Sequence, residues 1–140
     1  MAAHSNREVE HLSGKECWRL LSTAPIGRLA TAVVDAANGE LFLDVFPVNF
    51  LVHEEAIYFR TGPGSKLMEI TSNNRVAFEA DHRSGSVNWS VVVHGRARRV
   101  MMDREIEESG VLELEADHPT DKWNYVCVTV DSITGSRFSR

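Results

Sequence analysis

The stretch "VNWSVVVHGRARRVMM", residues 87–102, is the longest strand-like segment of the 140-residue chain. Apolar and polar side chains alternate along it with a period of two, which is typical of a strand with one buried face. The apolar face carries Val87, Trp89, Val91, Val93 and Ala97, and the polar face carries Asn88, Ser90, Val92, His94, Arg96 and Arg98. Gly95 interrupts the pattern and predicts a β-bulge or a close backbone contact. The stretch therefore predicts a sheet-based fold.

Shorter segments on either side complete this picture. Further strands are predicted over 26–34, 41–52, 56–61, 75–81 and 125–133, and short helices over 13–24, 65–72 and 103–116. Ser13 followed by Glu16 forms a capping-box pattern, and Asp103 is the expected cap of the third helix. Six strands with three helices between them predict a mainly β, antiparallel, barrel-like domain over 13–140. Residues 1–12 are polar and are predicted to form a flexible N-terminal segment.

The segment "LFLDVFPVNFLV", residues 41–52, is apolar on both alternating faces apart from Asp44 and Asn49. A strand with one wet face should alternate, so this one is expected to be covered on both sides.

Composition excludes several classes of function. A net charge of −5 argues against a general nucleic-acid binder. No apolar run approaches the roughly 20 residues that cross a bilayer, and no signal peptide is apparent, so a cytoplasmic protein without a membrane partner is expected.

Cys17 and Cys127 are expected to be reduced, buried thiols, with a disulfide as the alternative. The histidines show no metal-ligand spacing, and neither a metal site nor a haem ligand is expected.

The junction "YFRTGPGSKLMEI", residues 58–70, places Arg60 and Lys66 beside Thr61, Ser65 and two glycines. A helix N-terminus offers unpaired backbone N–H groups, and the two cations could add charge-assisted bonds to a phosphate. The alternative is an ordinary Gly-Pro-Gly turn with a capping serine and a solvated lysine. The spacing does not match the Walker pattern.

Five segments together resemble the pyridoxamine 5′-phosphate oxidase-like, FMN-binding split-barrel family, particularly its short actinobacterial flavin- and deazaflavin-dependent reductases. They are "GRLAT" (27–31), "PVNF" (47–50), "IYFRT" with "GPGSKL" (57–67), "VAFEAD" (76–81) and "WSVVVHGRARRV" (89–100). The resemblance implies a homodimer of six-stranded split β-barrels with two cofactors at the subunit interface.

The same resemblance implies a set of cofactor-binding residues. Arg60, Thr61, Ser65 and Lys66 match the phosphate-binding pattern, beside Phe59, and Val48 and Asn49 match residues that line the isoalloxazine ring. Trp89, Ser90 and Val91 match residues that approach from the partner subunit, and Arg137 falls near the ring. From the residues alone, Asn49 could equally be a satisfied core amide, Trp89 a packing residue and Arg60 the partner of a carboxylate.

The resemblance implies an FMN-binding oxidoreductase that passes a hydride or electrons to a small organic acceptor. The alternatives are a flavin-binding module without turnover, a deazaflavin (F420)-dependent reductase and a cofactor-free barrel. Vitamin B6 oxidation is not favoured, because the chain is short and "LDVFPVNF" replaces the basic strand motif of the true oxidases. The cofactor would perform the redox step, so no catalytic side chain is assigned.

Overall fold

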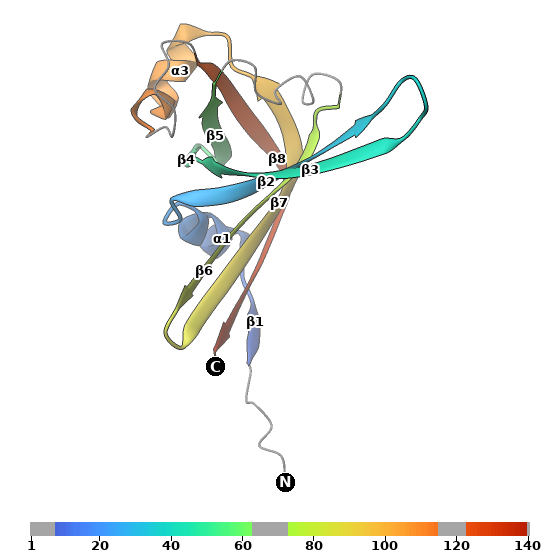
Figure 1. Ribbon diagram of the computed structural model, residues 1–140. Coiled ribbons are helices and arrows are strands. Elements are labelled where there is room, and N and C mark those ends of the chain that lie inside the picture. Colours follow the sequence, from blue (N-terminus) through green and yellow to red (C-terminus); the bar gives the residue numbers. More distant parts are fainter. Residues whose placement is uncertain (1–7, 63–72, 115–122, 140) are drawn as a thin grey trace.

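A computed structural model describes residues 8–62, 73–114 and 123–139, and Figure 1 shows their arrangement. The described strands form one antiparallel sheet in the order β3-β2-β6-β7-β8-β5-β4, with β1 paired to β8. The strands are β1 (Val9–His11), β2 (Ile26–Val34), β3 (Leu41–Asn49), β4 (Leu51–His53), β5 (Ala56–Thr61), β6 (Arg75–Ser84), β7 (Val87–Arg99) and β8 (Asn124–Ser139). The helical elements are α1 (Gly14–Leu21), α3 (Asp103–Ser109) and the 3₁₀ turn η1 (Val111–Glu113). The predicted mainly β, antiparallel fold is confirmed.

The long antiparallel pair β7–β8 forms the spine of the molecule. Its register shifts between His94 and Gly95, which confirms the predicted bulge. A Cβ atom at Gly95 would lie 2.2 Å from the backbone oxygen of Thr129, so the glycine also permits the close backbone contact.

Two differences raise the strand number from the expected six to eight among the described residues. The predicted strand 41–52 divides into β3 and β4 at Phe50, whose buried ring packs edge-on against Phe78 with centroids 4.8 Å apart. At Phe50 the chain changes its pairing partner, from β2 for β3 to β5 for β4. Residues 1–12, which were predicted to be flexible, contain the additional strand β1, in which Val9 pairs with Phe138 of β8.

Helix α1 confirms the predicted cap, since the Ser13 hydroxyl accepts a hydrogen bond from the Glu16 backbone N–H at 3.2 Å. Its buried side chains are Cys17, Leu20 and Leu21, which belong to the main core. Cys17 and Cys127 are both free and buried, as predicted. Burial raises the pKa of both thiols.

Helix α3 begins one residue away from the prediction. Its N-cap is Met102, which makes no side-chain capping bond, and Asp103 is instead the first helical residue. The Asp103 carboxylate is favourable there because the first turn carries partial positive charge. The helix ends at Ser109 because Gly110 adopts a left-handed conformation (φ 83°). The helix predicted over 65–72 lies outside the described residues.

None of the described helices is long and apolar enough to cross a membrane.

Candidate functional site

The predicted site residues fall into two groups. The first lies where β3 and β5 end, and comprises Val48, Asn49, Phe59, Arg60 and Thr61. There Arg60 pairs with Tyr125 and Thr61 with Asn124 at the start of β8. Ser65 and Lys66, which the sequence assigns to the same group, lie outside the described residues.

Arg60 is held firmly by its surroundings. Its guanidinium donates to the backbone oxygens of Leu112, at 3.4 Å, and Leu114, and it lies over the Trp123 ring, 4.5 Å from the centroid. The Nε atom of Arg60 is buried without a hydrogen-bond partner in the part of the chain that the structure describes. An unpaired donor on a fixed cation fits an anionic ligand, because it is oriented before the ligand arrives.

The other members of the first group offer fewer free side-chain atoms. Phe59 is completely buried in the main core, and Val48 packs against that core. Their contribution to a ligand would therefore come from the backbone. Asn49 and Thr61 are half-buried, and each already has an interaction partner.

The second group lies near the opposite end of β7 and β8. Trp89 pairs with Arg137, Ser90 with Ser136 and Val91 with Gly135. Trp89 and Val91 are buried in the core, while Ser90, between them on the strand, points to the other face of the sheet and is half-buried.

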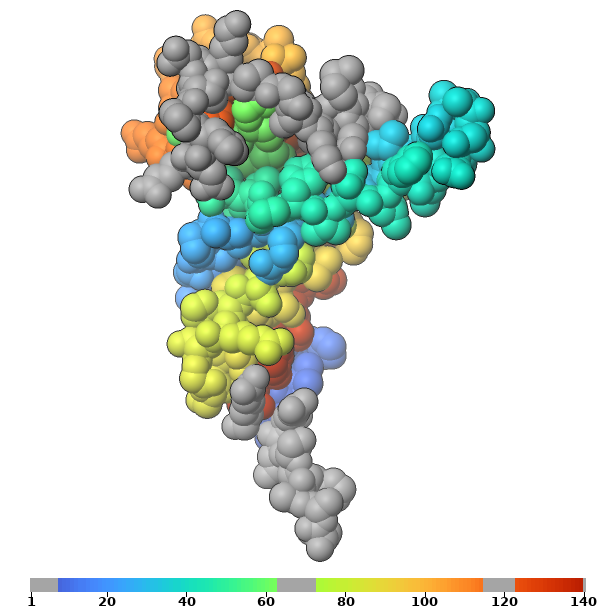
Figure 2. Space-filling view, in the orientation of Figure 1, coloured from blue at the N-terminus to red at the C-terminus, as the bar shows by residue number. Residues whose placement is uncertain are grey.

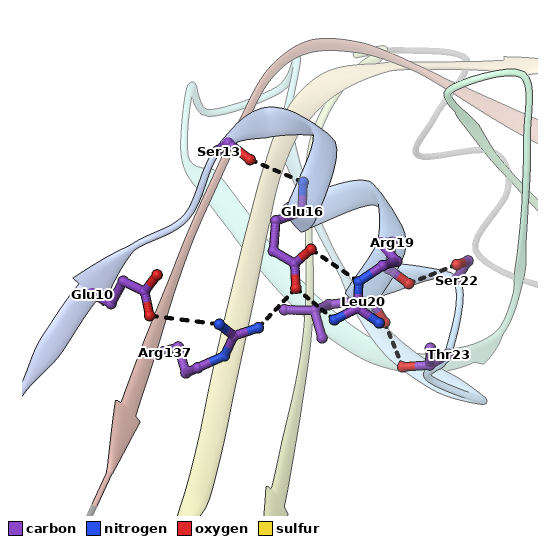
Figure 3. Close-up of polar contacts among 8 residues, drawn as sticks. All are labelled: Glu10, Ser13, Glu16, Arg19, Leu20, Ser22, Thr23 and Arg137. Carbon is purple, nitrogen blue, oxygen red and sulfur yellow. Dashed lines mark hydrogen bonds and ion pairs between the residues drawn. The ribbon is translucent and has the colours of Figure 1, made fainter.

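Arg137 lies within a network of charges between β1, α1 and β8 (Figure 3). Its guanidinium approaches Glu16 at 2.7 Å and Glu10 at 3.5 Å, and Glu16 also binds Arg19. The hydrogen bond from Arg19, assisted by Arg137, lowers the pKa of Glu16 from 4.5 to about 2. Arg137 is thus a cation already paired with carboxylates.

Arg60 of the first group and Trp89 of the second lie far apart within one chain. Arg60 faces Tyr125 and Trp89 faces Arg137, so twelve residues of β8 separate them. At the usual rise per strand residue this is roughly 40 Å along β8. Figure 1 shows the start of β8 near α3 and its end beside the C-terminus, at opposite ends of the molecule.

An apolar surface also stands out on the hairpin formed by β2 and β3. This surface, which we call the apolar arm, comprises Val34, Leu41, Phe42, Leu43 and Val45, each at least 50% exposed. Figure 2 shows the hairpin projecting from the body of the molecule. At its base a groove of about 260 Å³ is lined by Ala30, Ala32, Leu43, Arg75, Ala77 and His94.

Three features were missed from the sequence. Trp123 stacks on Arg60, but nothing in its neighbours indicates this partner. Asn88 belongs to the polar face of β7, yet it is buried. Arg98, from the same face, binds Glu105, which accepts a hydrogen bond of 2.8 Å from the Tyr58 hydroxyl.

This Tyr58–Glu105–Arg98 cluster joins β5, α3 and β7 beside an open hollow of about 190 Å³. Burial, followed by the bond to Glu105, raises the pKa of Tyr58, so the phenol stays protonated and donates. The described residues contain no group of three or more His, Cys, Asp or Glu side chains that could hold a metal ion.

Comparison with known families and structures relates this arrangement to other proteins. The sequence profile of a family described as pyridoxamine 5′-phosphate oxidase matches residues 13–137. A comparison with curated proteins found no match.

Solved structures give the same relationship. A Corynebacterium glutamicum protein described as a candidate pyridoxamine 5′-phosphate oxidase is 37% identical, with a TM-score of 0.81 over 95% of this chain and 100% of that one. An FAD-binding protein from Mycobacterium smegmatis is also 37% identical, with a TM-score of 0.77 over 94% and 99% of the two chains. An FAD-binding protein from Mesorhizobium loti shares the fold at 24% identity and a TM-score of 0.77, covering 96% and 100%.

Proposed function

The chain belongs to the pyridoxamine 5′-phosphate oxidase family, and we propose that it is a cytoplasmic, FMN-binding oxidoreductase whose two cofactor sites form between the subunits of a homodimer. The observation that carries this proposal is the separation of Arg60 from Trp89 along β8. No mononucleotide reaches across roughly 40 Å, so one ligand can contact Arg60 together with Trp89 only if these two residues come from different chains.

The apolar arm supports the same assembly. Contiguous apolar side chains on an exposed edge strand promote association in water, because burying them is favourable. Strand β3 is such an edge, and its side chains are exposed on both faces near the hairpin tip. A second copy that covers the arm would satisfy the pattern of residues 41–52.

Flavin is the cofactor class that suits the donors in the first group. The Nε donor of Arg60 is buried and has no partner among residues 8–62, 73–114 and 123–139, and the guanidinium is fixed by the Leu114 carbonyl and the Trp123 ring. With Lys66, it would hold the phosphate of FMN by charge-assisted hydrogen bonds. The FAD-binding relative from M. smegmatis supports flavin binding in general. F420 and FAD are alternative cofactors for the same phosphate-binding residues.

The chain's own residues would bind and orient the cofactor. The first group would anchor the phosphate, the backbone beside Val48 and Asn49 would line the ring, and Ser90 of the partner subunit would contact it from the other side. When bound, the flavin supplies the hydride or electron transfer to a small organic acceptor. The closed core around Phe59 and Val91 would give the ring a rigid, apolar support.

The phosphate assignment is tested with Lys66→Ala, which removes a cation while leaving Arg60 and its contacts in place. A hydrogen bond to a charged group contributes about 1.5–3 kcal/mol, so FMN affinity should fall about tenfold or more. Riboflavin, which lacks the phosphate, should bind this variant and the unaltered protein equally. Lys15→Ala, on the exposed side of α1, is the matched control. Equal weakening of both ligands would contradict the assignment.

The second candidate function is a flavin-binding module without turnover. It is favoured by one observation, that the M. smegmatis relative is described only by what it binds. Rapid reoxidation of the reduced, protein-bound cofactor by an added quinone or nitro compound supports the oxidoreductase. Reoxidation no faster than that of free FMN supports the module.

A further inference from the structure

The side chain of Asn88 is enclosed by the protein but is not satisfied by it. The residue is 2% exposed, and its Nδ2 atom is buried without a hydrogen-bond partner among the described residues. An amide N–H removed from bulk water without an acceptor is destabilising, and such groups are rare in folded proteins. A retained group of this kind requires an explanation, and a ligand acceptor is one.

The position of Asn88 suggests what that acceptor is. It lies on β7 directly before Trp89, faces Phe138 on β8, and is two residues from Ser90 on the same strand. Since side chains two residues apart point to the same face, Asn88 and Ser90 share the sheet face opposite to that of Trp89 and Val91. Arg83, its neighbour on β6, is exposed to solvent.

We propose that Asn88 donates a hydrogen bond from Nδ2 to a carbonyl oxygen of the flavin ring held by the first group of the partner subunit. This inference rests on the proposed function and adds a residue that recognises the flavin ring rather than the phosphate. A neutral amide suits a neutral ring carbonyl, whereas the cations of the first group suit the phosphate. The amide also carries an acceptor oxygen, which complements the carbonyl and N–H groups that alternate along the pyrimidine edge of the ring.

The test uses Asn88→Leu, which replaces the amide by an apolar side chain of similar size. If the donor has no partner in the free protein, its removal should leave the melting temperature unchanged or raise it. Affinity for FMN and for riboflavin should fall by the same factor, about tenfold, because both contain the ring. That pattern differs from Lys66→Ala, which should affect FMN alone. Flavin fluorescence quenching measures both affinities.

Asn74→Leu, at an exposed asparagine on the approach to β6, is the matched control and should leave both affinities unchanged. Sedimentation equilibrium should give the same dimer affinity for Asn88→Leu as for the unaltered protein. A weakened dimer would overturn the inference, because the acceptor would then belong to the partner chain.

Unchanged flavin affinity in Asn88→Leu, or a lowered melting temperature of the free protein, would also overturn the inference while leaving the proposed function intact. If the unaltered protein binds neither FMN nor riboflavin, the proposed function fails and this inference fails with it.

Discussion

The guanidinium carbon of Arg60 lies 4.5 Å from the centroid of the Trp123 ring, so the end of β5 is tied to the residue that precedes β8. The same guanidinium donates to backbone oxygens around η1. Arg60 therefore joins three segments before any ligand binds. A cation fixed in this way loses little conformational freedom when an anion arrives, which favours tight binding.

Arg60→Lys tests whether the planar shape of the Arg60 guanidinium stabilises the fold beyond its positive charge. Lysine keeps the positive charge but cannot form the planar fork or stack in the same way, so unfolding free energy should fall by about 1–3 kcal/mol. Urea denaturation measures this change. Arg75→Lys, at an exposed position on β6, is the control and should change stability by less than about 0.5 kcal/mol. Equal stabilities for the two variants would show that the Arg60 contacts do not stabilise the fold.

Leu43→Glu introduces a charge on the apolar arm, where the side chain is 71% exposed. In a homodimer that covers the arm, the charge would be buried without a partner, so the variant should be monomeric and should lose flavin binding. Light scattering coupled to size-exclusion chromatography measures the mass. Met101→Glu, at a residue 69% exposed and away from the arm, should remain dimeric. A dimeric Leu43→Glu protein with bound flavin would place the interface elsewhere.

Glu16→Gln tests the charge network of Figure 3 through its dependence on pH. The pKa of Glu16 is lowered from 4.5 to about 2, so its ionised form stabilises the folded protein. This contribution is fully present above pH 4.5 and is lost as the pH falls toward 2. The variant should therefore melt below the unaltered protein at pH 7 and at the same temperature near pH 2.

Thermal melts across this range check the pH dependence, with the exposed Glu107→Gln on α3 as the control. Because Glu16 and its partners are reached by solvent, high salt should reduce the difference at pH 7. A constant difference from pH 7 to pH 2 would show that the carboxylate does not act through its charge.

Gly27→Ala places a Cβ atom 2.1 Å from the tip of the buried Phe78 ring. The ring cannot move freely in the core, so the substitution should lower unfolding free energy by about 1–3 kcal/mol. Adding Phe78→Leu shortens the opposing side chain and should recover part of that loss. A double-mutant cycle measures the coupling, which we expect to exceed about 0.5 kcal/mol. Additive losses would contradict the close contact.

Much of the fold was predictable because it depends on local patterns. The alternation over 89–99, Gly95 and the Ser13 cap each have a direct local cause, and the structure confirms all three. At the start of the stretch the prediction is wrong, because Val87 is exposed and Asn88 is buried. The break at Phe50 was not predictable, because the chain changes its partner strand there from β2 to β5, and residue patterns do not show which strands pair. The helix stop at Gly110 could have been recognised from the glycine itself.

The candidate site was predictable only in part. The resemblance supplied its residues, but the sequence could not show that Arg60 stacks on Trp123 or that Arg60 and Trp89 face opposite ends of β8. The burial of Asn88 was not predictable from the sequence, because a polar residue on the polar face of a strand is expected to be exposed. These properties arise from tertiary packing, which single-residue patterns do not encode.

The claim that each cofactor site draws on two chains is tested most directly by mixing two inactive variants. Lys66→Glu would block the first group, and Ser90→Trp would block the second, so each homodimer should bind no FMN. After joint unfolding and refolding, a mixed dimer contains one site in which both groups are unaltered. The account predicts that FMN binding returns in the mixture at the affinity of the unaltered protein. Failure to recover any binding, although mixed dimers are present by native mass spectrometry, would show that both groups of a site come from the same chain.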